Sequence, residues 1–227
     1  MAQLTWDGTG DKIFETGTDR GVYYPLTDEG TYSGGVPWNG LTGVTESPSG
    51  AESNKHYADN IVYANILSAE EFGATIEAFT WPDEFDNSDG LAQVAAGVTV
   101  GQQTRRPFGF SYRTKIGNDV QGQDFGYKLH LIYGATASPS EKAYTTVSDS
   151  TEPTTFSWEL STTPVAVGTI GGVEYKPTAL IVIDSTKVDE GALESLEELL
   201  YGTDGGGEDP GTPAELPLPS EVIALFS

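Results

Sequence analysis

Short segments in which apolar and polar residues alternate predict a mainly β protein. Residues 72–80 place four apolar side chains on one side of an extended chain and Glu77 on the other. The four apolar residues are Phe72, Ala74, Ile76 and Ala78. Further segments with a strand pattern lie at residues 22–25, 38–46, 108–113, 125–133, 156–161 and 178–184.

Residues 61–67 form a strand pattern of another kind. Ile61, Tyr63 and Leu67 fall on one side, and Val62 and Ile66 fall on the other. Both sides are therefore largely apolar, which predicts a strand that is covered on its two faces.

One segment has helical periodicity. Residues 188–201 carry Leu193, Leu196, Leu199 and Leu200 on one stripe, so they predict a single flanking α-helix. Asp189, Glu190 and Glu194 suit its N-terminal end, and Gly202 can cap its C-terminal end.

The rest of the chain reads as connections and arms. Loops are expected at residues 47–56 and 86–106. The domain organisation predicted is an N-terminal arm at 1–20, a β domain at 21–202 and an acidic Gly/Pro-rich arm at 203–227. The apolar hexamer at its end, residues 221–226, is expected either to pack back on its own domain or to add to a neighbour.

Composition narrows the classes of partner. The chain of 227 residues has 11 Lys and Arg against 34 Asp and Glu, a formal charge of −23, so tight nucleic-acid binding is not expected. The charge fits either simple solubility or a surface that DNA passes without sticking. Cysteine is absent, and no apolar run suggests a membrane span or a signal peptide, so a soluble product is expected.

Candidate chemistry is weak throughout, and we predict no catalytic, cofactor-binding or metal-binding residues and no enzyme. His56 and His130 lack a second histidine at ligand spacing and read as surface polar residues. Residues 109–113 resemble a nucleophile elbow but end in Arg113, and Gly8–Gly10 is an incomplete dinucleotide motif. Residues 86–90 suggest calcium but fail the EF-hand register, so a polar turn is favoured.

Basic residues are unevenly spread. Five of the 11 lie within 24 residues, whereas the chain from residue 188 onward has none and many acids. The five are Arg105, Arg106, Arg113, Lys115 and Lys128. Such an asymmetry is either complementary between copies, as in rings and filaments, or a locally mixed surface.

Several segments together resemble the major tail tube proteins of long-tailed, non-contractile bacteriophages. The resemblance runs from about residue 20 to the end. It is carried by residues 36–46 (VPWNGLTGVTE), 70–85 (EEFGATIEAFTWPDEF), 97–103 (GVTVGQQ), 108–114 (FGFSYRT), 126–134 (GYKLHLIYG), 155–159 (TFSWE) and 177–184 (PTALIVID).

The resemblance implies a β-sandwich with a flanking helix and an inner β-barrel shared by the subunits of a ring, typically a hexamer. Rings stack into a tube that conducts genome DNA through a negatively charged lumen. The partners implied are further copies of the chain and the tail tip, tape measure and tail terminator proteins. The implied location is the virion tail, with assembly in the host cytoplasm and no membrane partner. Residues 1–20, 47–56, 86–106 and 203–227 are then candidate connectors between rings.

Within this reading, outward carboxylates such as Glu77 are expected to line the lumen. The alternative is a monomeric β-sandwich that binds carbohydrate or a receptor on a virion, with Trp38, Trp81 or Tyr112 as stacking platforms. A hydrolase is a third reading, but pairs such as Glu70/Glu71 and Asp83/Glu84 have no position that sets an acid opposite a base.

Overall fold

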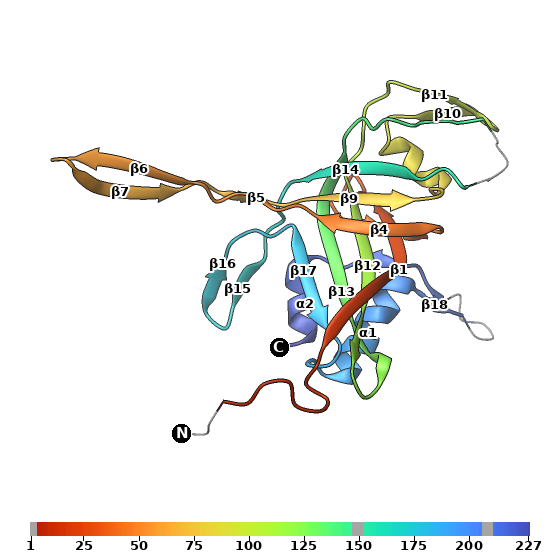
Figure 1. The fold of residues 1–227 in the computed structure, drawn as a ribbon. Helices are drawn as coiled ribbons and strands as arrows, with labels where there is room; N and C mark the ends of the chain where they lie inside the picture. Colours follow the sequence, from red (N-terminus) through yellow and green to blue (C-terminus); the bar gives the residue numbers. More distant parts are fainter. Residues whose placement is uncertain (1–3, 147–151, 206–210) are drawn as a thin grey trace.

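Antiparallel strands are the main secondary structure, as expected for a mainly β protein. The computed structural model describes residues 4–146, 152–205 and 211–227 (Figure 1). The main sheet has the strand order β3 (Val36–Pro37), β1 (Phe14–Pro25), β12 (Phe108–Asn118), β13 (Gly122–Ala137), β14 (Phe156–Thr162), β9 (Gly73–Ala78) and β4 (Leu41–Glu46), and β17 (Leu180–Asp184) also pairs with β13.

Strand β13 joins two halves of this sheet. Its residues 128–132 pair with β17, and its residues 135–137 pair with β14. Gly134 lies between them with φ +59°, where an added Cβ would lie 2.2 Å from the Thr163 carbonyl oxygen. Strands β14, β9 and β4 consequently run across β1, β12, β13 and β17 (Figure 1).

The two faces of the β1–β12–β13 layer are both covered. One face meets β4, β9 and β14 around an aromatic core that contains Tyr23, Trp38, Phe85, Phe110 and Trp158. The other face packs against the helices through a second core, which includes Tyr24, Leu129, Leu131, Tyr133, Leu193, Leu196, Leu200, Leu216 and Val222. Alternating side chains of one strand thus serve two cores.

The described residues contain two α-helices where one was expected. Helix α1 (Glu190–Tyr201) begins after Asp189, whose side chain accepts a hydrogen bond from the Ala192 N–H, and ends at Gly202 with φ 73°. Helix α2 (Pro219–Leu225) was expected only as an apolar terminal hexamer. Pro219 starts this helix, and the Glu221 carboxylate accepts from the Leu218 N–H.

Helix α2 also answers the question left open for the C-terminal hexamer. Val222 is buried against α1 and the sheet, so the segment packs back on its own chain. Leu216 is buried as well and pairs with Tyr32, which ties the expected C-terminal arm to the domain. Residues 206–210 of that arm lie outside the described residues.

The smaller strands form hairpins and local pairs. They are β6 (Ser53–Ala58) with β7 (Ile61–Leu67), β5 (Ser49–Gly50) with β8 (Glu70–Glu71), β10 (Ala92–Ala95) with β11 (Val98–Val100), β15 (Gly168–Ile170) with β16 (Val173–Tyr175), β18 (Thr203–Asp204) with β19 (Gly211–Thr212), and β2 (Tyr32–Ser33) with β20 (Glu215–Leu216). A 3₁₀ helix, η1 (Asp83–Asn87), precedes β10.

Several connections are more ordered than expected. The predicted loop at 47–56 contains β5 and the first residues of β6, and the predicted loop at 86–106 contains the β10–β11 hairpin. Strand β1 starts at Phe14 and crosses the boundary placed at residue 20, because its early residues pair with the end of β12. Residues 1–3 of the expected N-terminal arm lie outside the described residues.

Candidate assembly surfaces

The hairpin β6–β7 projects from the body as an arm, defined here as residues 47–72 with the β5–β8 pair at its root (Figure 1). Its turn is Asp59-Asn60, with φ values of 51° and 65°. Two consecutive positive φ angles give the turn the twist that a two-residue hairpin needs, and Asp and Asn tolerate them. The β6–β7 hairpin therefore has a definite geometry, while the root of the arm contacts the body through Phe72, which packs against the aromatic core.

Strand β7 of the arm carries large apolar side chains on both faces, and these side chains are exposed. Tyr63 is 76% and Leu67 63% exposed on one side of β7, and Ile66 is 58% and Val62 48% exposed on the other. The sequence predicted a strand covered on two faces, and the part of the chain that the structure describes leaves both faces of β7 exposed. An isolated two-stranded hairpin is marginally stable in water, and exposed apolar patches are a common mark of interaction surfaces.

A second surface is the outer face of β4, β9 and β14. Here the side chains that point away from the aromatic core are small and polar or acidic. They are Thr45 on β4, Thr75 and Glu77 on β9, and Ser157, Glu159 and Ser161 on β14. We call this set the polar strand face. Glu77 lies on it, as an exposed outward residue of β9, and its register partner is Ser157.

The polar strand face has one charge sign. Glu77 and Glu159 lie on adjacent strands, and β4, β9 and β14 contain no Lys or Arg. Glu159 was not singled out from the sequence, although its alternation with Trp158 and Leu160 placed it outward. The face is thus flat, polar and negative.

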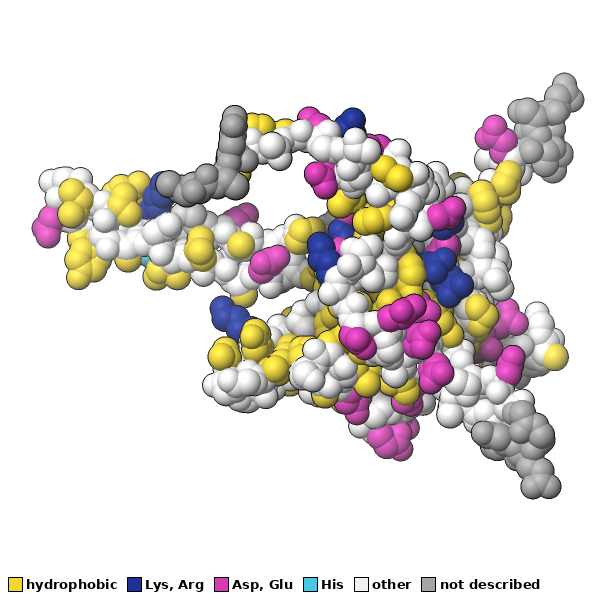
Figure 2. Space-filling view, turned by 90° about the horizontal axis from the view of Figure 1, so that it is seen from below, with side chains coloured by type: hydrophobic (Ala, Val, Ile, Leu, Met, Phe, Trp, Pro, Cys, Tyr) yellow, Lys and Arg dark blue, Asp and Glu magenta, His cyan; other side chains and the backbone are white. Residues whose placement is uncertain are grey.

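Charge separates the arm from the body. Residues 53–67 contain Lys55 and Asp59 and so carry no net charge, in a chain of −23. Apolar side chains run along the arm, while acidic side chains gather mainly on the body (Figure 2). Copies of so acidic a chain repel one another, and the β6–β7 part of the arm adds no net charge to this repulsion, whereas its root carries Glu52, Glu70 and Glu71.

A buried polar cluster ties the root of the arm to the centre of the sheet. Glu46, the last residue of β4, accepts a hydrogen bond from the Tyr112 hydroxyl at 2.6 Å, and its Oε1 lies 2.9 Å from His130 Nδ1. The other ring nitrogen of His130 lies 3.0 Å from the Thr114 hydroxyl oxygen, and the ring stacks on Tyr112. The arm therefore leaves the sheet from a residue fixed to β12 and β13.

This cluster corrects the expectation that His130 is a surface residue. His130 is buried on β13, and burial lowers its pKa below the usual value, while Glu46 opposes that shift. Burial and the Glu46 hydrogen bond raise the pKa of Tyr112 far above its usual value, so its hydroxyl stays a donor. His56, by contrast, is exposed on the arm.

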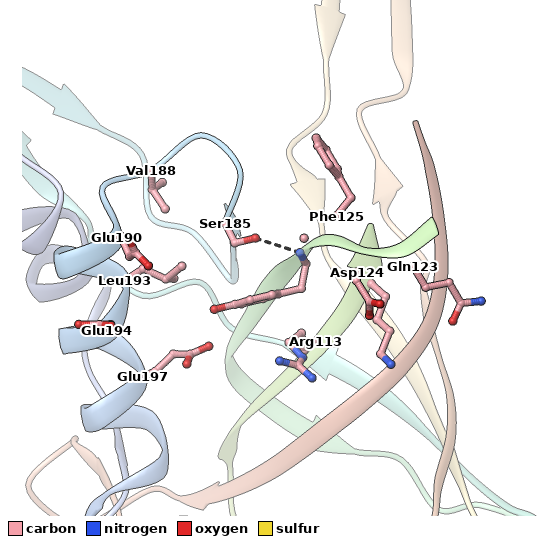
Figure 3. Close-up of a pocket in the computed structure, with 13 residues that line it drawn as sticks. Arg113, Gln123, Asp124, Phe125, Ser185, Val188, Glu190, Leu193, Glu194 and Glu197 are labelled. Atoms are coloured by element: carbon pink, nitrogen blue, oxygen red, sulfur yellow. Dashed lines mark hydrogen bonds between the residues drawn. The ribbon is translucent and has the colours of Figure 1, made fainter. Parts of the chain in front are cut away.

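A groove of about 740 Å³ lies between α1 and the β12–β13 hairpin. Glu190, Leu193, Glu194 and Glu197 of α1 line one side of it, and Glu197 extends toward Arg113 on the other side (Figure 3). Arg113 binds both carboxylate oxygens of Asp19, at 2.7 and 2.9 Å, and its guanidinium lies over the Tyr127 ring. Sequence reasoning missed this groove, because its walls come from segments far apart in the chain.

Most of the basic band is already paired within the chain. Arg105 binds Asp89, Arg106 lies 3.8 Å from Asp28, Arg113 binds Asp19, and Lys128 binds Glu15. Lys115 forms no salt bridge with the described residues. Four of the five residues thus belong to a mixed surface rather than to a free basic band.

The segments that resembled a calcium loop and a nucleophile elbow have structural roles. Asp89 is buried and binds Arg105 and Lys142, so the polar turn at 86–90 is held by ion pairs. The segment that resembled a nucleophile elbow is part of strand β12. Among the described residues, no group of three or more His, Cys, Asp or Glu is placed to hold a metal ion.

The proposed sugar platforms are mostly inside the molecule. Trp38 and Tyr112 are buried, and Trp38 donates a hydrogen bond to the Thr80 carbonyl oxygen. Trp81 is half-buried, with Lys142 over its ring and its N–H donated to Asp86. None of the three offers a free ring face of the kind that sugar stacking needs.

Comparison with known proteins adds no relative: no protein-family model matches the chain, and no curated protein matches it. In the part of the chain that the structure describes, no helix has the length and apolar character to cross a membrane.

Proposed function

We propose that this protein is a structural subunit of a phage tail tube, which assembles into stacked rings and conducts genome DNA. The observation that carries the proposal is strand β7 of the arm, whose large apolar side chains are left exposed on both faces by the described residues. A strand that is apolar on both faces needs two covering surfaces, and further copies of a repelling acidic chain can meet best at the uncharged β6–β7 hairpin.

The polar strand face supports the conduit. DNA passes freely along a wall only if the wall offers no cations to its phosphates. Glu77 and Glu159 meet this need on a face with no Lys or Arg. We assign this face to the lumen, as part of an inner β-barrel shared between the copies of a ring, which the resemblance makes a hexamer.

The remaining features of the proposal come from the resemblance alone. They are a tail-tube β-sandwich fold, a place in the virion tail after assembly in the host cytoplasm, and contacts with the tail tip, tape measure and tail terminator proteins. Segments outside the main sheet, such as residues 4–13 and the arm, are the candidates for contacts between rings.

Negative-stain electron microscopy of concentrated protein across a salt series tests the assembly. Added salt screens the repulsion between copies, so rings or tubes with a central channel are expected to grow with ionic strength. Ile66→Asp should prevent them, because it places a charge on the apolar arm. Single particles at every salt concentration, even with tail tips added as nuclei, would replace this proposal with the monomeric binding module.

A DNA-retention assay tests the lumen. Tubes of the Glu77→Lys/Glu159→Lys variant are expected to form normally but to retain DNA fragments in a salt-dependent way, whereas wild-type tubes release them. Equal release by both kinds of tube would remove the polar strand face from the lumen and leave assembly standing.

A further inference from the structure

We propose that the groove beside α1 receives the arm of a second copy of this chain. The inference rests on the proposed function, because it names the receptor for the arm. A donor surface and a different receiving surface on each copy make a heterologous contact, which repeats from copy to copy into a ring or a stack.

The groove has an acidic wall, in which Glu197 shares a hydrogen bond with the Tyr127 hydroxyl. Glu190, Glu194 and Glu197 form no salt bridge with any described residue, and α1 has no basic residue. The Oε1 atom of Glu197 is buried without a hydrogen-bond partner among the described residues. A buried carboxylate oxygen without a donor is costly, so this wall favours a ligand that brings donors or a positive charge.

The groove also has apolar surface and one free cation. Leu193 and Val188 lie beside the acids, and Phe125 and Tyr127 lie on the β13 side. Lys115 belongs to the same lining and forms no salt bridge with the described residues. A fitting ligand is therefore apolar, with one cation for α1 and one anion for Lys115.

Residues 53–67 of the arm have this composition. Lys55 is exposed on β6 and forms no salt bridge with the described residues, and Asp59 is exposed in the turn. Tyr57 and Tyr63, 69% and 76% exposed, add aromatic surface and hydroxyl donors. Charge and apolar surface of the arm thus complement those of the groove.

The arm cannot reach the groove of its own chain. It extends away from the body and from α1 (Figure 1), and Glu46, Tyr112 and His130 fix its root to the sheet. Only another copy can place its groove around the arm.

Cysteine cross-linking tests this pairing directly, because the chain has no native cysteine. The Asp59→Cys/Lys115→Cys variant, oxidised after assembly in high salt, is expected to give a ladder of covalent oligomers on a non-reducing gel. Asp59→Cys/Glu29→Cys is the matched control, since Glu29 is exposed in a turn and does not line the groove. It should stay monomeric on the gel.

Microscopy of the same samples separates the two proposals. Rings or tubes without a ladder would overturn the groove as receptor and leave assembly intact, whereas the absence of both would overturn both. A ladder from Trp6→Cys/Lys115→Cys without one from Asp59→Cys/Lys115→Cys would assign the groove to the N-terminal segment and also overturn this inference.

A charge exchange gives a second measurement that needs no cross-link. Lys55→Glu should raise the protein concentration needed for assembly by about fivefold, the effect of one surface ion pair of about 1 kcal/mol. Adding Glu194→Lys to Lys55→Glu should restore assembly. No restoration, with both variants folded by circular dichroism, would count against contact between these side chains.

Discussion

Strands β7 and β13 have the same apolar pattern and opposite surroundings. Both carry large apolar residues on the two sides of the strand. In β13, Leu129, Leu131, Ile132 and Tyr133 are all buried, because one side faces the aromatic core and the other faces α1 and α2. In β7, Ile61, Val62, Tyr63, Ile66 and Leu67 are all exposed. A two-sided apolar strand thus indicates that both faces are to be covered, without saying whether the same chain does it.

Placing an aspartate on each strand should give the largest difference in monomer stability between the two. Leu131→Asp should destabilise the monomer by roughly 4 kcal/mol or more, because it buries an unpaired carboxylate in the core. Ile66→Asp should change monomer stability by no more than about 0.5 kcal/mol, since its site is solvent-exposed. Urea denaturation at low salt and low concentration measures both, and equal losses of stability would mean that the arm is held by its own chain.

A smaller loss of stability is expected at Gly134, which lies between the parts of β13 that pair with β17 and with β14. Gly134→Ala should cost roughly 2 kcal/mol or more, because its φ of +59° is strained for alanine and the new Cβ would meet the Thr163 carbonyl oxygen. Gly122→Ala is the control, with φ +63° and no atom within 4 Å of the added Cβ, and should cost about 1 kcal/mol. Similar losses at the two sites, measured by thermal unfolding, would show that the close packing at Gly134 contributes nothing.

The smallest expected effect is on the pH dependence of stability, and it concerns His130 of β13 and His56 of the arm. The pKa of His130 is lowered by burial, so the unfolded chain binds more protons below the ordinary pKa of about 6.5. His130 should therefore make the protein lose stability as pH falls below about 6.5, and His130→Gln should flatten that loss. His56→Gln, on the exposed arm, is the matched control. A pH profile of the urea midpoint that is unchanged in His130→Gln would contradict this.

Local patterns predicted the elements whose partners lie in the same chain. The leucine stripe and Asp189 placed α1 to within two residues, and the alternation around Ile76 and Trp158 placed β9 and β14 with their buried sides. Strand β6 was missed because its sequence, SNKHYA, has no apolar alternation and becomes a strand by pairing with β7. Helix α2 was missed because a short apolar segment has no periodicity of its own.

The polar cluster at Glu46, the groove and the polar strand face could not be predicted from local patterns, because each is formed by residues far apart in the sequence. Glu46 meets Tyr112 and His130 across 66 and 84 residues of sequence, and the groove joins α1 to β12 and β13. Glu77 was predicted as an outward residue from alternation alone, and the order β14–β9–β4 is what places Glu159 on the neighbouring strand. Side-chain direction was therefore readable from the sequence, and the neighbours of each side chain were not.

The polar strand face has a consequence for engineering. Because residues alternate along β9 and β14, Ala74, Ile76, Trp158 and Leu160 hold the core, while the residues between them only line the surface. The surface set can then be rewritten independently of the fold. If this face lines the channel, the same scaffold can be converted into pores of chosen charge by changing a few outward residues and leaving the inward ones untouched.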